Sequence, residues 1–190
     1  MPIDKHVLGK FRKYGDVFIE TGTLSGQGVK NALAVGFKRV YSIELSEYNY
    51  KVSKQNVGND PRATLIFGDS SVELPKLIQT IAEPCVIWLD AHFSGGTTAG
   101  EGKPAPLLLE LEAIAKHPVK NHAILIDDVR IYSDSRYNML DLDMFKDIEQ
   151  GTNPDWANAL NRLYLINNDY KLSLEDGFVK DDILVATVGE

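Results

Sequence analysis

The sequence has little cysteine, no excess of positive charge and no long apolar run. Its only cysteine, Cys85, excludes an internal disulfide bond and a multi-cysteine zinc site. Because Cys85 lies inside the apolar run CVIWL, we interpret it as a core thiol and not as a nucleophile. The formal net charge of -7 argues against a nucleic-acid partner that is bound through its phosphates. No run approaches the ~18 apolar residues of a membrane span, and the N-terminus lacks the apolar segment of a signal peptide. We therefore expect a cytoplasmic protein with no membrane partner.

The size and composition are those of an ordinary globular protein. The chain has 190 residues, of which 44% are hydrophobic and 25% charged. This length is enough for one well-buried domain and short for two. We therefore expect a single domain over residues 1–190.

Short apolar runs alternate with helical patterns over most of the chain. The runs are rich in Val, Ile, Leu and aromatic residues, as expected for strands buried on both faces; they cover residues 16–20, 39–45, 63–68, 85–90 and 122–128. The helical patterns cover residues 28–36, 46–57, 71–82 and 105–117. Pro75 falls within the third pattern, so that helix either has an irregular first turn or begins near Glu73. This alternation predicts a parallel sheet with helices on both faces.

The C-terminal part has a different pattern. A helical stretch over residues 154–165 is followed by two strand-like runs, 170–176 and 181–188, which are separated by a short turn containing Gly177. This spacing indicates an antiparallel hairpin. The expected fold is α/β, a Rossmann-like three-layer sandwich with a seven-stranded, mostly parallel sheet that ends in an antiparallel hairpin.

A glycine-rich turn, FIETGTLSGQG, follows the first predicted strand. Gly22, Gly26 and Gly28 let the backbone approach a ligand, and the helix that follows offers free N–H groups. The spacing is G-x-x-x-G-x-G, whereas the dinucleotide motif is G-x-G-x-x-G. Glu20 stands directly before the glycines, where an acid would repel a pyrophosphate. The turn therefore indicates a nucleotide-like ligand, and Glu20 argues against a phosphate at this position.

Two further acids follow the second and third predicted strands. Glu44 is placed to accept hydrogen bonds from both hydroxyls of a ribose; the alternative is a solvated acid at a strand end. Asp69, followed by Ser70, is placed to take the exocyclic amine of an adenine. Asp69 is equally well placed as the N-cap of the next helix, and the two roles are compatible.

Together these residues resemble the class I S-adenosylmethionine-dependent methyltransferases. The resemblance rests on the motif E-T-G-T-L-S-G-Q-G, on Glu44, on Asp69-Ser70 and on the terminal hairpin, and it covers nearly the whole chain. It implies that the glycine-rich turn holds the methionine portion of S-adenosylmethionine, with Glu20 near its ammonium group, directly or through water. The implied cofactor-binding residues are Glu20, Gly22, Thr23, Gly26, Gly28, Glu44, Leu45, Asp69, Ser70 and Asp90.

Three acids follow the fourth and fifth predicted strands, in WLDAH and LIDDV. If these strands are neighbours, Asp90 lies close to Asp127 and Asp128 at the rim of the predicted pocket. Oxygen ligands of this kind suit Mg²⁺ or Ca²⁺, and such an ion lowers the pKa of an acceptor hydroxyl. Adjacent residues on a regular strand point to opposite faces, so one of the pair is alternatively a helix cap or a partner for Arg130.

His92 lies two residues after Asp90. An imidazole titrates near neutral pH, so His92 is a candidate general base that removes the acceptor proton, although most loop histidines have no such role. The loop over residues 93–106 is rich in Gly, Thr and Pro, and is either a substrate lid or a surface loop. The candidate catalytic residues are Asp90 and His92.

Within this class, WLDAH, LLLELEAI and LIDDV look like the sugar O-methyltransferases of the macrocin type. That resemblance implies Asp90, Asp127 and Asp128 as ligands of a magnesium ion. His92 is a departure, because these enzymes tend to have a second acid two residues after the first. The N-terminal extension of that group is also nearly absent here.

The first functional hypothesis is methyl transfer to a hydroxyl of a small molecule or glycan. Methylation of nucleic-acid bases fits less well, because the expected Asn/Asp-Pro-Pro-aromatic motif is replaced by DAHF at residues 90–93. An NAD(P)-dependent oxidoreductase and a catalytically silent nucleotide-binding module stay open as alternatives. A homo-oligomer is compatible with the sequence, which does not identify the acceptor.

Overall fold

The computed structural model describes residues 2–91, 106–132 and 154–189, and within these ranges seven strands form one sheet in the order β3-β2-β1-β4-β5-β7-β6. The strands are β1 (Val17–Thr21), β2 (Arg39–Glu44), β3 (Ala63–Phe67), β4 (Cys85–Leu89), β5 (Ala123–Ile126), β6 (Tyr170–Glu175) and β7 (Ile183–Val188). The first five are parallel, and β7 is antiparallel to β5 and to β6. The predicted mostly parallel sheet with a C-terminal antiparallel hairpin is therefore confirmed.

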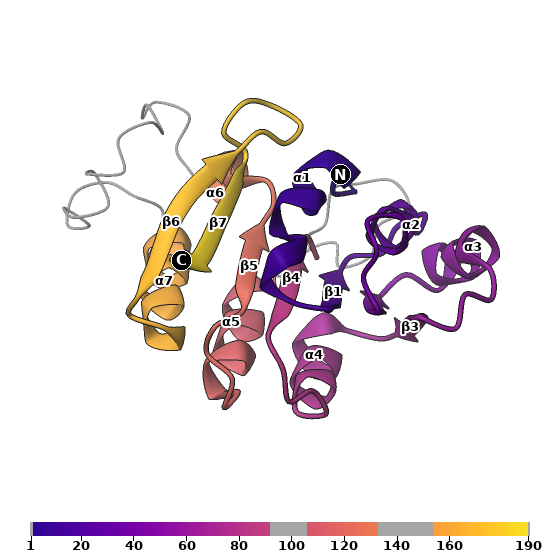
Figure 1. The fold of residues 1–190 in the computed structure, drawn as a ribbon, viewed down its shortest axis with the longest axis horizontal. Helices are drawn as coiled ribbons and strands as arrows, with labels where there is room; N and C mark the ends of the chain where they lie inside the picture. Colours follow the sequence, from indigo (N-terminus) through magenta and orange to yellow (C-terminus); the bar gives the residue numbers. More distant parts are fainter. Residues whose placement is uncertain (1, 92–105, 133–153, 190) are drawn as a thin grey trace.

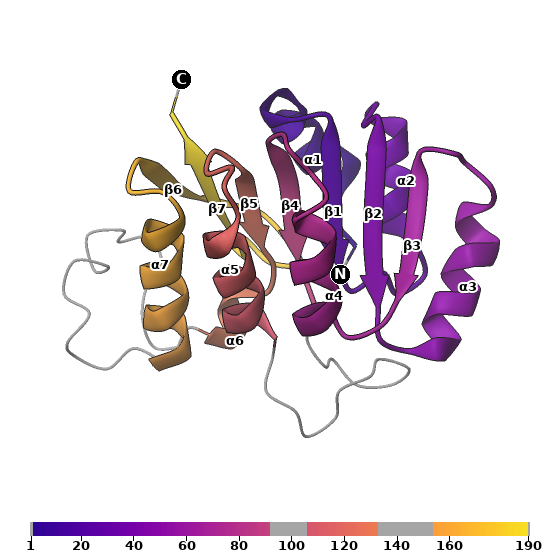
Figure 2. The ribbon, with the colours of Figure 1, turned by 90° about the horizontal axis from the view of Figure 1, so that it is seen from below.

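Helices cover both faces of the sheet, as predicted. They are α1 (Lys5–Phe11), η1 (Arg12–Tyr14), α2 (Gln27–Ala34), α3 (Glu47–Val57), α4 (Ser70–Ile78), α5 (Leu107–Lys116), α6 (Val129–Tyr132) and α7 (Pro154–Ile166). Figure 2 shows α4, α5 and α7 in front of the sheet and α1 and α2 behind it, with α3 beyond the β3 edge. Among the described residues, no helix combines the length and apolarity that a membrane crossing needs.

The central strands are buried along their whole length, which explains why their sequences read as continuous apolar runs. Their side chains alternate between two cores. Val17 and Ile19 pack in the core beneath α4, α5 and α7, whereas Phe18 packs in the core beneath α1 and α2. Figure 1 shows α1 and α2 on one side of the sheet and α4 and α5 on the other.

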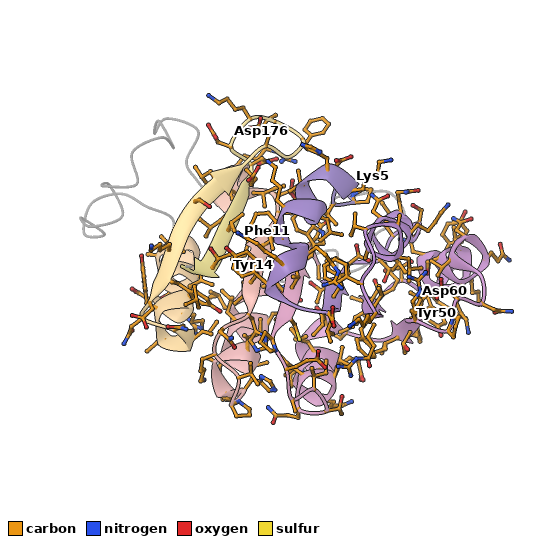
Figure 3. The ribbon with its side chains drawn as sticks, viewed as in Figure 1. Lys5, Phe11, Tyr14, Tyr50, Asp60 and Asp176 are labelled. Atoms are coloured by element: carbon orange, nitrogen blue, oxygen red, sulfur yellow. The ribbon has the colours of Figure 1, made fainter. Side chains whose placement is uncertain are left out.

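The sequence pattern did not predict helix α1. Asp4 caps this helix by accepting a hydrogen bond from the backbone N–H of His6 at 2.7 Å, and Leu8 and Phe11 bury its inner face. Figure 3 labels Phe11, the last residue of α1, and Tyr14 of η1, whose ring centroids are 6.3 Å apart. A helix of 7 residues offers too few turns for its periodicity to be recognised.

Helix α4 begins before Glu73, which is one of the two predicted starts. It runs from Ser70, and Asp69 caps it by accepting the backbone N–H of Ser71 at 3.0 Å. Pro75 lies inside the helix. A start near Glu73 is therefore wrong, because the strong cap at Asp69 fixes the first turn and the helix accommodates the single missing donor of the proline.

Two histidines form a buried pair away from the predicted ligand edge. His122 Nδ1 accepts the backbone N–H of Cys85 at 3.0 Å, so its Nε2 carries the hydrogen of the neutral ring and donates to His117 Nδ1 at 3.0 Å. His117 Nε2 in turn donates to the carbonyl of Ile81 at 2.9 Å. Burial lowers the pKa of His122 to about 4. These rings, to which the sequence assigned no role, join the loops before β4 and β5.

Candidate active site

The glycine-rich turn lies where β1 passes beside β4. Gly22 has a φ of 87°, and a Cβ added there would stand 2.5 Å from the backbone oxygen of Asp90. Its N–H donates to the carbonyl of Ile43 at 2.9 Å. Gly26, with a φ of 81°, then turns the chain into α2. Glycine is required at Gly22 both for its backbone conformation and because three strand ends converge there.

Glu20 lies beneath the first turn of α2. Its side chain is 1% exposed, and Oε2 accepts a hydrogen bond from Ser42 Oγ at 2.7 Å. Ser42 Oγ is also 2.6 Å from Thr23 Oγ1, so a buried chain of hydroxyls joins Glu20 to the glycine-rich turn. Desolvation, together with the charges of Asp90 and Glu44, raises the pKa of Glu20 to about 8. The buried carboxyl group therefore favours its protonated form at neutral pH.

Glu44 ends β2 beside the same turn. Its Oε2 accepts the backbone N–H of Leu24 at 2.8 Å, and its Oε1 accepts that of Ser46 at 2.7 Å. Leu24 has a φ of 49°, which is a strained conformation for a leucine. Leu24 and Leu45, near Glu44, are both partly exposed. Backbone N–H groups of Thr23 and Leu45 also act on this carboxylate, and its binding to a ribose stays a prediction.

Asp69 and Ser70 follow β3. Asp69 Oδ1 accepts the N–H of Ser71 at 3.0 Å and lies 2.6 Å from Ser71 Oγ, so the predicted helix-cap role is confirmed. The cap engages Oδ1, which leaves the adenine role of Asp69 as a compatible prediction. Ser70 is 5% exposed, and its side chain hydrogen-bonds to Glu110.

Glu110, in the first turn of α5, is a buried acid at the site that the sequence did not predict. It is 1% exposed, and hydrogen bonding from the side chains of Ser70 and Thr21 acts on its carboxyl group. Desolvation outweighs these contacts and raises the pKa of Glu110 to about 7. The only available signal was a glutamate among the apolar residues of LLLELEAI, and the surface acid Glu112 two positions later carries the same signal.

The three predicted metal ligands lie together at the ends of β4 and β5. One oxygen from each of Asp90, Asp127 and Asp128 can be chosen so that all three atoms lie within 4.8 Å of one another. Asp127 and Asp128 are each 3% exposed. Strand β5 ends at Ile126, and Asp128 has a φ of 58°, so the alternation of a regular strand does not apply to this pair. The backbone turn therefore allows both carboxylates to reach one site.

The donor set fits a hard divalent cation. Three carboxylates at this spacing repel one another, and desolvation together with the charge of Asp128 raises the pKa of Asp127. Carboxylate oxygens are the preferred ligands of Mg²⁺. The alternative partner predicted for the pair is also present, because Arg130 forms an ion pair with Asp128 at 2.6 Å. The partner role is therefore confirmed for Asp128, and the metal-ligand role of the three acids stays a prediction.

His92 and residues 93–105 of the predicted lid lie outside the described residues. A general base at His92 and a substrate lid therefore stay predictions.

Sequence comparisons return no relatives: no family model matches the chain, and no curated protein matches it. Solved structures do match its fold. An O-methyltransferase of Bacillus cereus in complex with SAH (S-adenosylhomocysteine) has a TM-score of 0.63 at 16% identity, over 97% of this chain and 78% of that chain. A SAH-bound methyltransferase of Podospora anserina has a TM-score of 0.58 at 16% identity, over 98% of this chain and 76% of that chain.

A spermidine synthase of Thermotoga maritima is also similar, with a TM-score of 0.59 at 13% identity over 97% of this chain and 57% of that chain. At these identities the likeness establishes the Rossmann-like fold of methyltransferases and leaves the reaction to be argued from the site.

Proposed function

We propose that the chain is an S-adenosylmethionine-dependent O-methyltransferase that acts on a hydroxyl group of a small molecule or sugar with the help of Mg²⁺. One observation carries this proposal: the glycine-rich turn meets the acidic cluster where β1 and β4 end side by side. Gly22 and Asp90 are in backbone contact there. The predicted S-adenosylmethionine site and the predicted metal site therefore lie side by side at the carboxyl ends of the strands.

Methyl transfer breaks the bond between the methyl carbon and the sulfonium sulfur, forms a bond from that carbon to the acceptor oxygen, and releases the hydroxyl proton. In this proposal Glu44 and Asp69 hold the nucleoside, and Glu20 lies near the ammonium group. Asp90, Asp127 and Asp128 would hold the cation, which when bound supplies Lewis acidity that lowers the pKa of an acceptor hydroxyl. His92 is our candidate for the base that takes the proton.

The strand order supports this proposal over the oxidoreductase alternative. Dinucleotide-binding folds of the classic type have the order 3-2-1-4-5-6. Here an antiparallel strand, β7, stands between β5 and β6. The glycine spacing also disfavours a dinucleotide at this turn.

Ligand binding followed by turnover tests the proposal. Isothermal titration calorimetry should detect binding of S-adenosylhomocysteine and no binding of NAD(H) or NADP(H); the reverse result would overturn it. Release of S-adenosylhomocysteine should then be measured with S-adenosylmethionine, Mg²⁺ and a panel of sugars, nucleotide-sugars and phenolic hydroxyl compounds. Binding without turnover by any acceptor would favour the catalytically silent module.

A further inference from the structure

A residue in the turn between β6 and β7, Asp182, is linked to the acidic cluster of Asp90, Asp127 and Asp128 through the side chain of Arg130. Arg130 forms ion pairs with Asp128 and with Asp182, a residue 52 positions away in sequence. Asp182 lies in this turn, immediately before β7, and is 1% exposed. The guanidinium group of Arg130 thus lies between two carboxylates, of which only Asp128 belongs to the predicted metal cluster.

Backbone contacts fix Asp182 in this position. Its carbonyl accepts the N–H of Val129 at 3.0 Å, and its Oδ1 accepts the N–H of Arg130 at 3.3 Å. Gly177, in the same turn, has no side chain, and a Cβ added there would lie 3.1 Å from the Cβ of Asp182 and 3.5 Å from Asp127 Oδ1. The turn therefore packs directly against the cluster, and Asp182 is held on both its main chain and its side chain.

The second side of Arg130 is also covered. Its guanidinium carbon stands 5.3 Å from the ring centroid of Phe178, a cation–π contact that restricts where the arginine can go. Arg130 therefore contacts an aromatic ring and two carboxylates, and its Nη1 makes both ion pairs.

We propose that Asp182, acting through Arg130, is a positioning residue for the cation site formed by Asp90, Asp127 and Asp128; this inference rests on the metal-assisted function proposed above. Arg130 supplies the counter-charge that keeps Asp128 turned into the cluster. Asp182 holds the guanidinium group to one side, so that it does not enter the cluster in place of the cation. Partners of this kind, which orient ligands without touching the metal, commonly change metal affinity 10- to 100-fold when they are removed.

The neighbouring residue provides a matched control. Asp181 lies in the same turn and pairs with Lys180 at 3.8 Å, with its side chain 22% exposed. Asp182→Asn and Asp181→Asn are the same chemical change at adjacent positions. Only the first removes the carboxylate that holds Arg130.

The test measures Mg²⁺ binding to the full chain by calorimetry and by the Mg²⁺-dependent rise in melting temperature. We expect Asp182→Asn to weaken Mg²⁺ binding about tenfold and Asp181→Asn to leave it unchanged. Arg130→Lys keeps the charge but loses the planar guanidinium group that lies over Phe178 and pairs with both carboxylates, and should weaken binding in the same direction. It also serves as the second variant if Asp182→Asn fails to fold.

Three outcomes separate the possibilities. Equal Mg²⁺ affinity for Asp182→Asn, Arg130→Lys and wild type would overturn the inference while leaving the metal site intact. A wild-type protein that binds S-adenosylhomocysteine but shows no Mg²⁺ response would overturn both this inference and the metal part of the proposed function. Weaker Mg²⁺ binding by the two variants, with unchanged binding of S-adenosylhomocysteine, would support the positioning role.

Discussion

Gly28 lies directly against the carboxyl group of Glu20: a Cβ added at Gly28 would stand 1.8 Å from Glu20 Oε1. The first turn of α2 therefore packs on a buried acid, and no larger residue fits at this position without a shift. This contact places the acid that precedes the glycines beneath them and away from solvent.

The first prediction concerns this contact. Gly28→Ala should destabilise the protein by about 1–3 kcal/mol, because overpacking forces either Glu20 or the start of α2 to move. Binding of S-adenosylhomocysteine should fall as well. Gly9→Ala is the control, since its Cβ would meet only Val35 Cγ1 at 4.0 Å and alanine favours the helix by up to about 1 kcal/mol. Urea denaturation of both variants checks this, and equal effects would contradict it.

The second prediction uses the protonation of Glu20. Because the pKa of Glu20 is raised to about 8, a bound cationic amino acid group should lower it and release a proton. Affinity for S-adenosylmethionine should then rise as the pH increases from 6 to 7.5. Calorimetry in two buffers with different ionisation enthalpies counts the released protons. Glu20→Gln should release fewer protons; unchanged release would show that another group titrates.

The third prediction concerns Glu110. Its pKa is raised from 4.5 to about 7, so the folded state binds more protons than the unfolded state across this window and loses stability as the pH rises through it. The full effect is about 3 kcal/mol. Glu110→Gln should therefore match wild type at pH 5 and be more stable than wild type at pH 8. Glu112→Gln, at an exposed position of the same helix, should show no such gain in stability between pH 5 and pH 8 when both are measured by urea denaturation.

The fourth prediction concerns the histidine pair and has the opposite sign. The pKa of His122 is lowered from 6.5 to about 4, so the unfolded state binds more protons in this window. Stability from this group should fall by about 3 kcal/mol as the pH drops from 6.5 to 4. His122→Gln should be less stable than wild type at pH 7 and lose less stability on acidification. Parallel pH profiles for the two proteins would contradict this prediction.

The fifth prediction tests the predicted ligands themselves. Mg²⁺ should raise the melting temperature of the wild-type protein, because an ion that binds only the folded state stabilises it. Asp90→Ala should abolish that rise. Asp60→Ala is the control. It removes an acid that pairs with Arg62 before the start of β3, at the opposite ends of the strands from the acidic cluster, and it should keep the rise in melting temperature. An Asp90→Ala response equal to that of wild type would show that the site is misassigned.

The architecture could be predicted because each strand and helix carries its own pattern. Continuous apolar runs indicated the buried parallel strands, and the short turn at Gly177 indicated the hairpin. The order of glycines and acids along the chain was likewise enough to place Gly22, Glu44 and Asp69 at neighbouring strand ends. Helix α1 escaped prediction because a helix of 7 residues repeats its pattern too few times.

The sequence by itself determined the order of the elements, the position of the glycine-rich turn and the acids that meet at its edge. Tertiary structure decided which of these groups are buried and what they contact. The positive φ of Asp128 turns its side chain toward the cluster. Arg130 forms an ion pair with Asp182, which lies 52 residues away in sequence. Glu110 is buried, whereas the side chain of Glu112, two positions later among the same apolar neighbours, is exposed. Periodicity records which face of an element is apolar, whereas pairing between distant side chains and their pKa values arise only when those faces pack.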